Sequence, residues 1–151
     1  MALPRTYESL DCSVARALEV IGDRWTLLVI RSAFQGVRRF DDFQETLGIA
    51  RNVLADRLTR LCDEGLLRRV PYQERPERHE YRLTRKGVEL WPALVSLMLW
   101  GDRYYAPEGP PVLVSHKGCD GHVADGLVCS SCGRALEPHE VEPVPGPGVR
   151  D

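Results

Sequence analysis

The sequence has no long uninterrupted hydrophobic run. Its longest apolar stretch, Leu90 to Trp100, is interrupted by Pro92 and Ser96. It is also shorter than the roughly 20 apolar residues that a membrane-spanning helix needs. Residues 1–12 carry charged side chains and lack the apolar centre of a secretory signal. We therefore predict a chain that does not enter a membrane and that works in the cytoplasm.

Motifs typical of enzymes are also missing. We find no glycine-rich phosphate loop, no nucleophile elbow and no catalytic metal motif. We therefore predict that the chain is not an enzyme. What is present is the composition of a soluble globular protein, with 28% charged and 43% hydrophobic residues. A length of 151 residues fits one ordinary domain with a small appendage.

Cysteine is scarce, and its count of five is odd. An odd count fits poorly with a fully paired disulfide framework, and in a reducing cytoplasm cysteines are more often metal ligands or redox groups. Three of the five lie between Ser115 and Leu136, together with two of the four histidines. A disulfide, a redox dithiol and a metal site would each use such a cluster.

Charge is unevenly distributed along the chain. Residues 31–86 carry 13 Lys and Arg against 9 Asp and Glu, whereas residues 106–151 carry 3 against 7. Arginine dominates the basic segment. This moderate basic bias is compatible with a nucleic-acid partner, although it does not by itself identify one.

Apolar spacing predicts four helices, then a pair of short strands, then a long helix. The predicted helices cover Cys12–Ile21 with Asp11 as N-cap, Trp25–Phe34, Phe40–Leu47, about Arg51–Glu64, and Thr84 to about Tyr105, and the strands cover Leu66–Tyr72 and Glu80–Leu83. Pro92 predicts a kink or a displaced start in the last helix. This order is that of a winged helix-turn-helix, a mainly α (α+β) fold.

The predicted helix from about Arg51 to Glu64 has two contrasting faces. Its apolar stripe contains Leu54, Leu58, Leu61 and Cys62, and its other face is rich in Arg, Asn and Thr. Such a helix has the shape and polarity to enter a DNA major groove, although a solvated amphipathic helix would show the same pattern. Two arginines in the link between the strands, Arg75 and Arg78, favour DNA because a basic wing would add a second contact.

The long helix is apolar on more than one face. One face can pack on its own domain, while the remainder needs another partner. A second copy of the chain is the simplest candidate, so we predict a homodimer.

The tail contains two similar short loops, "HKGCDG" and "CSSCG", each with two metal-ligand types separated by two residues. Glycine permits the tight turn of a zinc knuckle, and apolar flanks at Val112–Val114 and Leu127–Val128 could pair as strands to join the loops. A fragment this small has too little core to fold alone, which favours a metal. We predict a closed, structural zinc site with the ligands His116, Cys119, Cys129 and Cys132.

Alternatives for the tail stay open at this point. His122 is a substitute fourth ligand by spacing, whereas His139 lies further along the chain and is expected at the surface. Cys129 and Cys132 could form a redox dithiol instead of a metal site, and the tail could also hold a disulfide or be unstructured.

Several ordered motifs between Cys12 and Gly101 closely resemble the HxlR family of bacterial transcriptional regulators. The motifs are "GDRWTLLVI", "RRFDDF", "GIARNVLADRL", "DEGLLRR", "YQERPER" with "EYRLTRKG", and a terminal "WG". The tail resembles, more weakly, a zinc-ribbon-like extension of some family members. The resemblance implies a homodimeric regulator that binds an inverted repeat in double-stranded DNA through a winged helix and dimerises through its first and last helices.

The resemblance also implies which residues meet DNA. Arg51, Asn52 and Asp56 would lie over base edges. Arg57, Thr59 and Arg60 would contact bases or the DNA backbone. The residues that would contact phosphate or the minor groove are Arg38, Arg39, Gln73, Arg75 and Arg78. One departure is Ala50, where family members usually have Ser, so the recognition helix lacks a side-chain N-cap worth about 1 kcal/mol.

Some family members sense oxidants through an early cysteine, which here is Cys12. A small-molecule or oxidant effector is therefore expected, although a thiol buried at a dimer interface would equally explain this cysteine. We predict four parts: residues 1–105 for DNA binding and dimerisation, a linker at 106–111, a zinc-ribbon-like appendage at 112–140 and a disordered tail at 141–151. The alternative function is a protein-interaction adaptor that uses the zinc tail on a winged-helix scaffold.

Overall fold

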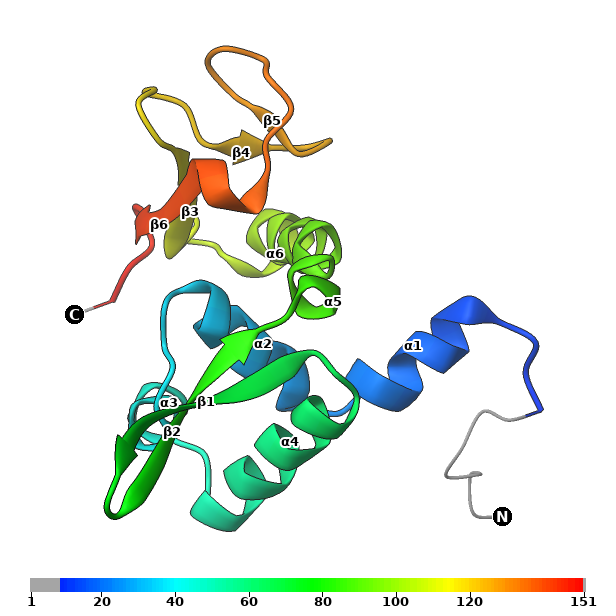
Figure 1. Ribbon diagram of the computed structural model, residues 1–151. Coiled ribbons are helices and arrows are strands. Elements are labelled where there is room, and N and C mark those ends of the chain that lie inside the picture. Colours follow the sequence, from blue (N-terminus) through cyan, green and yellow to red (C-terminus); the bar gives the residue numbers. More distant parts are fainter. Residues whose placement is uncertain (1–8, 151) are drawn as a thin grey trace. The chain divides into compact units, whose positions relative to one another are not determined.

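The computed structural model describes residues 9–150 and divides the chain into two compact units, Met1–Gly87 and Val88–Asp151 (Figure 1). The boundary lies before the long helix. The sequence instead predicts a boundary after residue 105. In the structure the long helix groups with the cysteine-rich tail and not with the domain that precedes it.

The first unit has the element order of a winged helix-turn-helix, as the sequence predicts. Its elements are α1 (Ser13–Ile21), α2 (Thr26–Phe34), α3 (Phe40–Leu47), α4 (Arg51–Asp63), β1 (Leu67–Glu74) and β2 (Glu77–Leu83), followed by the short α5 (Arg85–Val88) at the boundary. Bounds of the helices agree with the predictions within about one residue. The fold class is thus confirmed, with mixed helix and sheet.

Apolar side chains from α2, α3 and α4 form the core of this unit. Val29 and Ile30 of α2, Phe43 of α3 and the α4 stripe of Leu54 and Leu58 are fully buried. Because the buried α4 residues recur at helical spacing, the opposite face of α4 is left in solvent. The core therefore orients α4 and decides which of its residues can meet another molecule.

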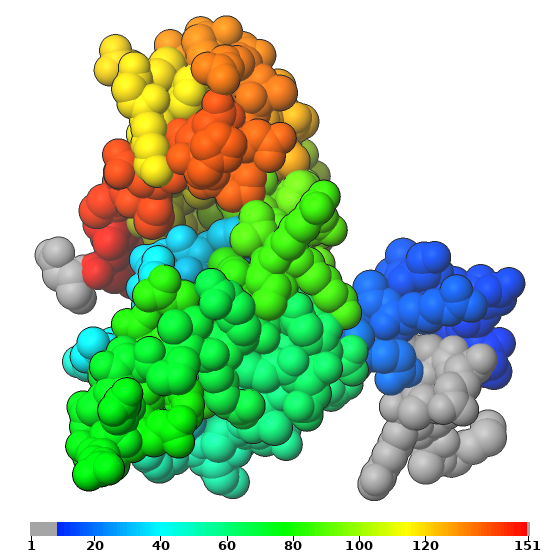
Figure 2. Space-filling model, in the orientation of Figure 1, coloured from blue at the N-terminus to red at the C-terminus, as the bar shows by residue number. Residues whose placement is uncertain are grey.

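Helix α1 stands apart from the α2–α4 body (Figures 1 and 2). Its N-cap is Cys12, without a side-chain capping bond, so the prediction of Asp11 as N-cap is wrong. Asp11 instead pairs with the guanidinium of Arg16 at 3.0 Å. An N–H of Arg60 on α4 donates to the backbone oxygen of Glu19, which ties the end of α1 to α4.

The strands β1 and β2 form an antiparallel hairpin that is longer than predicted. The register runs from the Leu67–Leu83 pair to the Glu74–Glu77 pair, with an irregularity between Pro71 and Gln73. The polar residues that we predict as a link therefore continue the ladder, and the turn is confined to Arg75 and Pro76. In Figure 2 the tip of this hairpin projects from the helices of the same unit.

Two helices replace the single one predicted from Thr84 to Tyr105. The Thr84 hydroxyl accepts a hydrogen bond from the Gly87 N–H at 3.1 Å and caps the start of α5. Helix α6 (Trp91–Tyr105) begins one residue before Pro92, where a missing N–H costs nothing. The displaced start, one of the two outcomes predicted for Pro92, is the one observed.

The tail folds as two small strand pairs and the turns that join them. Strand β3 (Val112–His116) pairs with β6 (Val141–Pro145), and β4 (Val123–Ala124) pairs with β5 (Val128–Cys129). The predicted pairing of the Val112 and Leu127 flanks is therefore wrong, and residues 141–145 form a strand where a disordered tail is expected. Strand β6 is hard to predict from the sequence because it contains two prolines. An edge strand tolerates proline.

Candidate nucleic-acid interface and metal centre

The outer face of α4 presents polar side chains to solvent. The exposed members are Arg51, Asn52, Asp56, Thr59 and Arg60. They share one face because Leu54, Leu58 and Leu61 occupy the other, buried one. The sequence-predicted contacts of this helix are therefore brought together, apart from Arg57, which is half-buried.

The start of α4 has no side-chain cap. Ala50 occupies the N-cap position in extended conformation, with φ −61° and ψ 139°, and makes no side-chain hydrogen bond. The missing cap predicted from the sequence is thus confirmed. Gly48 closes the preceding helix α3 in the left-handed region, at φ 61°, which glycine adopts at no steric cost. The N–H groups of the first turn of α4 consequently remain available to an external acceptor.

Asp23 holds Arg57 against the start of α2. Its carboxylate accepts hydrogen bonds from the backbone N–H groups of Trp25 and Thr26, at 2.9 and 3.1 Å, and from the Thr26 hydroxyl. It also accepts from Nε of Arg57 at 2.8 Å. Asp23 was not among the predicted site residues, although an Asp three residues before an apolar helix is a recognisable helix-start signal.

The pKa values of Asp23 and Arg57 reflect these hydrogen bonds. Burial by itself would raise the pKa of Asp23, but hydrogen bonds from Thr26, the Trp25 backbone and Arg57 outweigh it and hold the pKa below its ordinary value of 3.8. The hydrogen bond that Arg57 donates to Asp23 also raises the pKa of Arg57. Both groups are therefore charged at neutral pH, and they fix the middle of α4 to the beginning of α2.

Arg51, at the start of α4, also has local partners. The guanidinium of Arg51 lies 4.6 Å from the ring centre of Phe40 and 3.4 Å from the carboxylate of Asp41. Both charged groups of that pair are largely exposed, so the pairing is weak and can be exchanged. These neighbours orient the Arg51 side chain, but its guanidinium can still form contacts with another molecule.

The β1–β2 hairpin carries basic residues near its tip. Arg75 and Arg78 are exposed, and the Gln73 amide donates to the backbone oxygen of Arg75 at 3.3 Å. Within residues 9–150, neither arginine side chain forms a hydrogen bond or an ion pair. Their charges are therefore directed into solvent.

Arg38 and Arg39 lie just before α3, beside the hairpin. The Arg39 guanidinium stacks over Tyr72 at 4.1 Å and lies 3.9 Å from Glu80. The Tyr81 N–H donates to the Arg38 backbone oxygen at 2.7 Å. These contacts join the start of α3 to the hairpin. Glu80 was not predicted, and its pKa is lowered by hydrogen bonds from Arg82.

Four potential metal ligands meet in the tail. One ligand atom from each of His116, Cys119, Cys129 and Cys132 lies within 4.8 Å of all the others. The Cys119 and Cys129 sulfurs are 3.8 Å apart, and the Cys132 sulfur is 3.6 Å from Nδ1 of His116. Two sulfurs at about 2.3 Å from a tetrahedral ion would be about 3.8 Å apart. The cluster can therefore hold a metal ion.

Tight turns and glycine make this cluster possible. The Cys119 N–H donates to the His116 oxygen at 3.1 Å, and the Gly133 N–H to the Cys129 oxygen at 3.0 Å, so each pair of ligands is closed by a turn. A Cβ atom at Gly121 would lie 2.2 Å from the Cys129 sulfur. A side chain at this position would therefore displace a ligand.

The Cys129 thiol ionises more readily than an ordinary cysteine. A hydrogen bond from the backbone N–H of Cys132, aided by those from Ser131 and His116, lowers the pKa of the Cys129 thiol to about 6. Thiolate is the form that binds a metal. His122, the substitute ligand, lies outside the cluster, with its Nδ1 3.4 Å from the Ser130 hydroxyl, and His139 is exposed as predicted.

The remaining cysteines are separate from this cluster. Cys12 is exposed at the start of α1, and Cys62 is half-buried beside the α4 core, where burial raises the pKa of its thiol. Within residues 9–150, no helix has the length and apolar character required to cross a membrane.

Comparison with known proteins identifies relatives for most of the chain. Residues 20–109 match the family described as HxlR-like helix-turn-helix. The uncharacterized HTH-type transcriptional regulator Rv3095 of Mycobacterium tuberculosis is 51% identical over 139 residues, which cover 91% of this chain and 88% of that protein. The crystal structure of PA1607, a proposed transcription factor, matches with a TM-score of 0.71 and 40% identity over 86% of this chain and 92% of its own. The redox regulator HypR in its reduced form matches with a TM-score of 0.58 and 29% identity, over 61% of this chain and 92% of its own.

Proposed function

Because the chain belongs to the HxlR-like helix-turn-helix family and is a winged-helix transcriptional regulator, not an enzyme, we propose that it binds an inverted-repeat operator as a homodimer. The observation that carries this proposal is the polar outer face of α4, which is exposed along the whole helix. The core fixes this face outward, so it needs no rearrangement before it meets DNA.

Helix α4 has the side chains that read a major groove. Asn52 can pair with an adenine edge through two hydrogen bonds, and Arg51 can pair with guanine. Asp56 can accept from cytosine, while Thr59 and Arg60 both lie about one turn beyond Asp56, within reach of bases or backbone. We propose that α4 is the recognition helix.

Arg57 has a different part in the proposal. Its guanidinium is held by Asp23 at 2.8 Å and by Asp56 at 2.5 Å. We propose that it acts at the DNA chiefly by fixing the rotation of α4 about its axis, so that Asn52 and Asp56 face the groove. Any backbone contact that it makes would then be secondary to this anchoring.

The hairpin and the start of α3 complete the proposed interface. Arg75 and Arg78 at the hairpin tip would neutralise phosphates or enter the minor groove, with Gln73 beside them. Arg38 and Arg39 would contact the backbone next to α3. The stacking of Arg39 on Tyr72 supports this, because it keeps the start of α3 and the wing in register.

Exposed apolar side chains support the homodimer. In the first unit, Val14 and Leu18 of α1 are 67% and 43% exposed. In the second, Leu97, Trp100 and Tyr104 of α6 are 51%, 52% and 63% exposed and recur at helical spacing. Monomeric proteins seldom leave such rows in water. We propose that a second copy of the chain covers them.

We propose that the metal in the tail is zinc. Three thiolates and one imidazole form a donor set that tetrahedral structural zinc prefers. Bound zinc would supply a rigid cross-link between the two loops, and it would hold no open position for a substrate because His116 and the three cysteines fill a tetrahedron. Cys119, Cys129 and Cys132 would bind as thiolates.

Cys12 supports a response to oxidation as part of this function. It is exposed at the start of α1, the helix proposed to dimerise, and HypR, a structural relative, is a redox regulator. Hydrogen peroxide would oxidise the thiol to a sulfenic acid and be reduced to water. Polarity added at this position would alter the dimer and hence operator binding.

DNA selection from fragmented genomic DNA, followed by fluorescence anisotropy on the enriched fragments, tests the proposed function. We expect enrichment of short inverted repeats and two protein chains per repeat. Protein variants carrying Asn52→Ala should lose enrichment, whereas Gln35→Ala, a change of an exposed amide outside α4, should retain it. Enrichment that survives Asn52→Ala with all repeat sequences unchanged, or retrieval of no DNA at all, would contradict the proposal and favour an adaptor role.

A further inference from the structure

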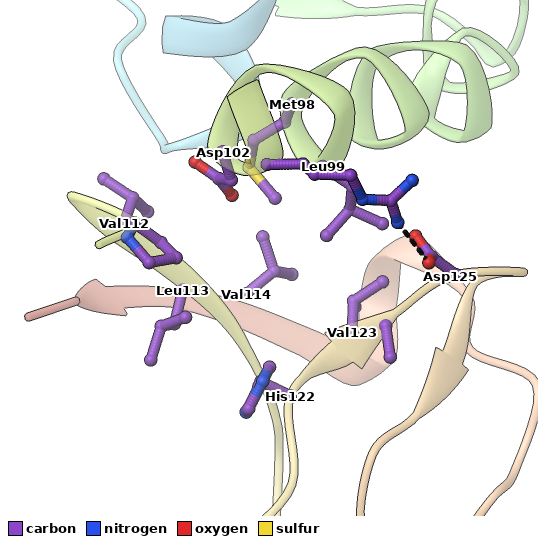
Figure 3. Close-up of a pocket in the computed structure, with 12 residues that line it drawn as sticks. Met98, Leu99, Asp102, Val112, Leu113, Val114, His122, Val123 and Asp125 are labelled. Carbon is purple, nitrogen blue, oxygen red and sulfur yellow. Dashed lines mark hydrogen bonds and ion pairs between the residues drawn. The ribbon is translucent and has the colours of Figure 1, made fainter. Parts of the chain in front are cut away.

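A cavity of about 330 Å³ lies in the second unit, between α6 and the strands β3 and β4 (Figure 3). This volume is at the lower end of the range for small-molecule sites. Residues of α6 form one wall, and residues of the two strands form the other. The lining comprises Met98, Leu99, Asp102, Arg103, Pro110, Val112, Leu113, Val114, His122, Val123, Ala124 and Asp125.

Most of the cavity wall is apolar, and its polar members are Asp102, Arg103, His122 and Asp125. Figure 3 shows Met98 and Leu99 of α6 directed toward Val114 and Val123 of the strands. Nothing in these side chains can form a hydrogen bond of ordinary strength. The main part of a bound molecule must therefore be apolar as well.

Charge at the rim of the cavity is unbalanced. The Arg103 guanidinium and the Asp125 carboxylate form an ion pair and neutralise each other. Asp102, which is half-buried, has no hydrogen bond or ion pair within residues 9–150, and burial raises the pKa of its carboxyl. A half-buried carboxylate beside apolar walls is less screened by water than one in open solvent, so a cation placed beside it would be stabilised.

From this combination we propose that the cavity binds a small organic cation, with its apolar body between α6 and the strands and its ammonium group on the carboxylate of Asp102. A primary amine on an aromatic or branched aliphatic body has this chemistry. The site goes beyond the proposed function, because it involves neither α4 nor the hairpin, and its test contains no DNA.

The cavity is separate from the face of α6 that the homodimer would use. Met98, Leu99 and Asp102 lie on one side of the helix, whereas Leu97, Trp100 and Tyr104 lie on the other, as 100° per residue requires. Dimerisation through the second row therefore leaves the cavity accessible.

The metal cluster holds the strand wall of the cavity. Strand β3 ends at the ligand His116, whose N–H donates to the Gly121 oxygen at 2.9 Å, and β4 begins at Val123, two residues later. Removing the cross-link between the two loops would free β4 to move from α6. Metal and amine should consequently bind with positive linkage, each raising the affinity for the other.

Isothermal titration of the full-length, metal-loaded protein with phenethylamine tests the site. We expect saturable binding of one molecule per chain, with a Kd on the order of 1 mM or tighter for a ligand of this size. Asp102→Asn should weaken it about tenfold or more, the effect of losing one charge-assisted hydrogen bond. Glu142→Gln, which removes an exposed carboxylate of the same unit outside the cavity, should leave the affinity unchanged.

Two further ligands and one variant make the test decisive. The neutral 2-phenylethanol should bind about tenfold more weakly than the amine, and the anion phenylacetate more weakly still. Ala124→Phe should abolish binding by filling the cavity, provided that the variant retains its metal content. Absence of saturable binding, equal affinity of the Asp102→Asn variant, or tighter binding of phenylacetate would overturn the proposal.

Discussion

Nε of Arg57 on the proposed recognition helix lies 2.8 Å from the carboxylate of Asp23, which also caps the N-terminus of α2. One carboxylate therefore both caps the start of α2 and fixes the rotation of α4. It does so with both partners about three-quarters shielded from solvent, so the interaction is stronger than that of a surface pair.

Substitution Asp23→Asn should destabilise the first unit. The amide keeps the shape of the carboxylate, but it loses the charge that binds Arg57 and weakens the cap on α2. We expect a loss of about 1–3 kcal/mol in the free energy of unfolding, measured by urea denaturation at pH 7. The exposed Asp42→Asn on α3 is the matched control and should cost well under half of that. Equal costs for the two variants would show that Asp23 has no special role.

Low pH should weaken the ion pair between Asp23 and Arg57 and so lower the stability of the first unit. Because the pKa of Asp23 is lowered in the folded state from the ordinary 3.8, the unfolded chain takes up the proton first. The stability from Asp23 is thus fully present above the unfolded pKa and is lost as the pH falls through the folded one. The slope of stability against pH below about pH 4 should be shallower in Asp23→Asn than in the parent. Identical acid slopes would contradict the lowered pKa.

The salt dependence of DNA affinity should distinguish residues that contact bases from residues that contact phosphates. Replacing both Arg75 and Arg78 by Gln removes four arginines from each dimer, so it should reduce the slope of log affinity against log salt by up to about 3.6, since each phosphate contact contributes about 0.9. Asn52→Ala should leave the slope unchanged but cost about 1–3 kcal/mol on the selected operator alone. Anisotropy titrations at several salt concentrations measure both. A salt slope that does not respond to the arginines would remove the hairpin from the interface.

Loss of the metal should unfold the tail and spare the first unit. Cys132→Ser should lower the zinc content, measured on protein purified without added metal, from about one ion per chain to near zero. Amide exchange should then rise around β3–β6, whereas residues of α2 to α4 stay protected. Cys12→Ser is the control and should retain its zinc. A folded, metal-free tail with reactive thiols would exclude a structural metal.

Charge placed on α6 should dissociate the proposed dimer. Trp100 is 52% exposed and lies beside Tyr104 and Tyr105, at 5.8 and 5.4 Å between ring centres. Trp100→Glu should give a monomer by light scattering, because an unpaired carboxylate cannot be buried in an apolar interface. Val149→Glu, which charges an exposed apolar residue outside α1 and α6, should remain dimeric. If the parent is itself monomeric, this surface has another partner.

Local patterns in the sequence accounted for much of the fold. The spacing of Leu54, Leu58 and Leu61 predicts both the helix and its buried side, and Gly48 predicts the end of α3, because these are properties of consecutive residues. The pairing of β3 with β6 was missed because it joins residues that are far apart in sequence. Prolines in β6 also conceal it, since a strand with prolines resembles a loop when its partner is unknown.

By itself, the sequence determined the order of helices and strands, the polar face of α4 and the four metal-ligand types, because hydrophobic periodicity and ligand spacing are local. Only the tertiary structure decided which histidine joins the three sulfurs, since His116 and His122 have similar spacings but point to different neighbours. It also decided that Arg57 is held by Asp23, 34 residues away, and that Asp102 borders a cavity without a partner. Contacts over such distances depend on how the core orients each element, which no local pattern records.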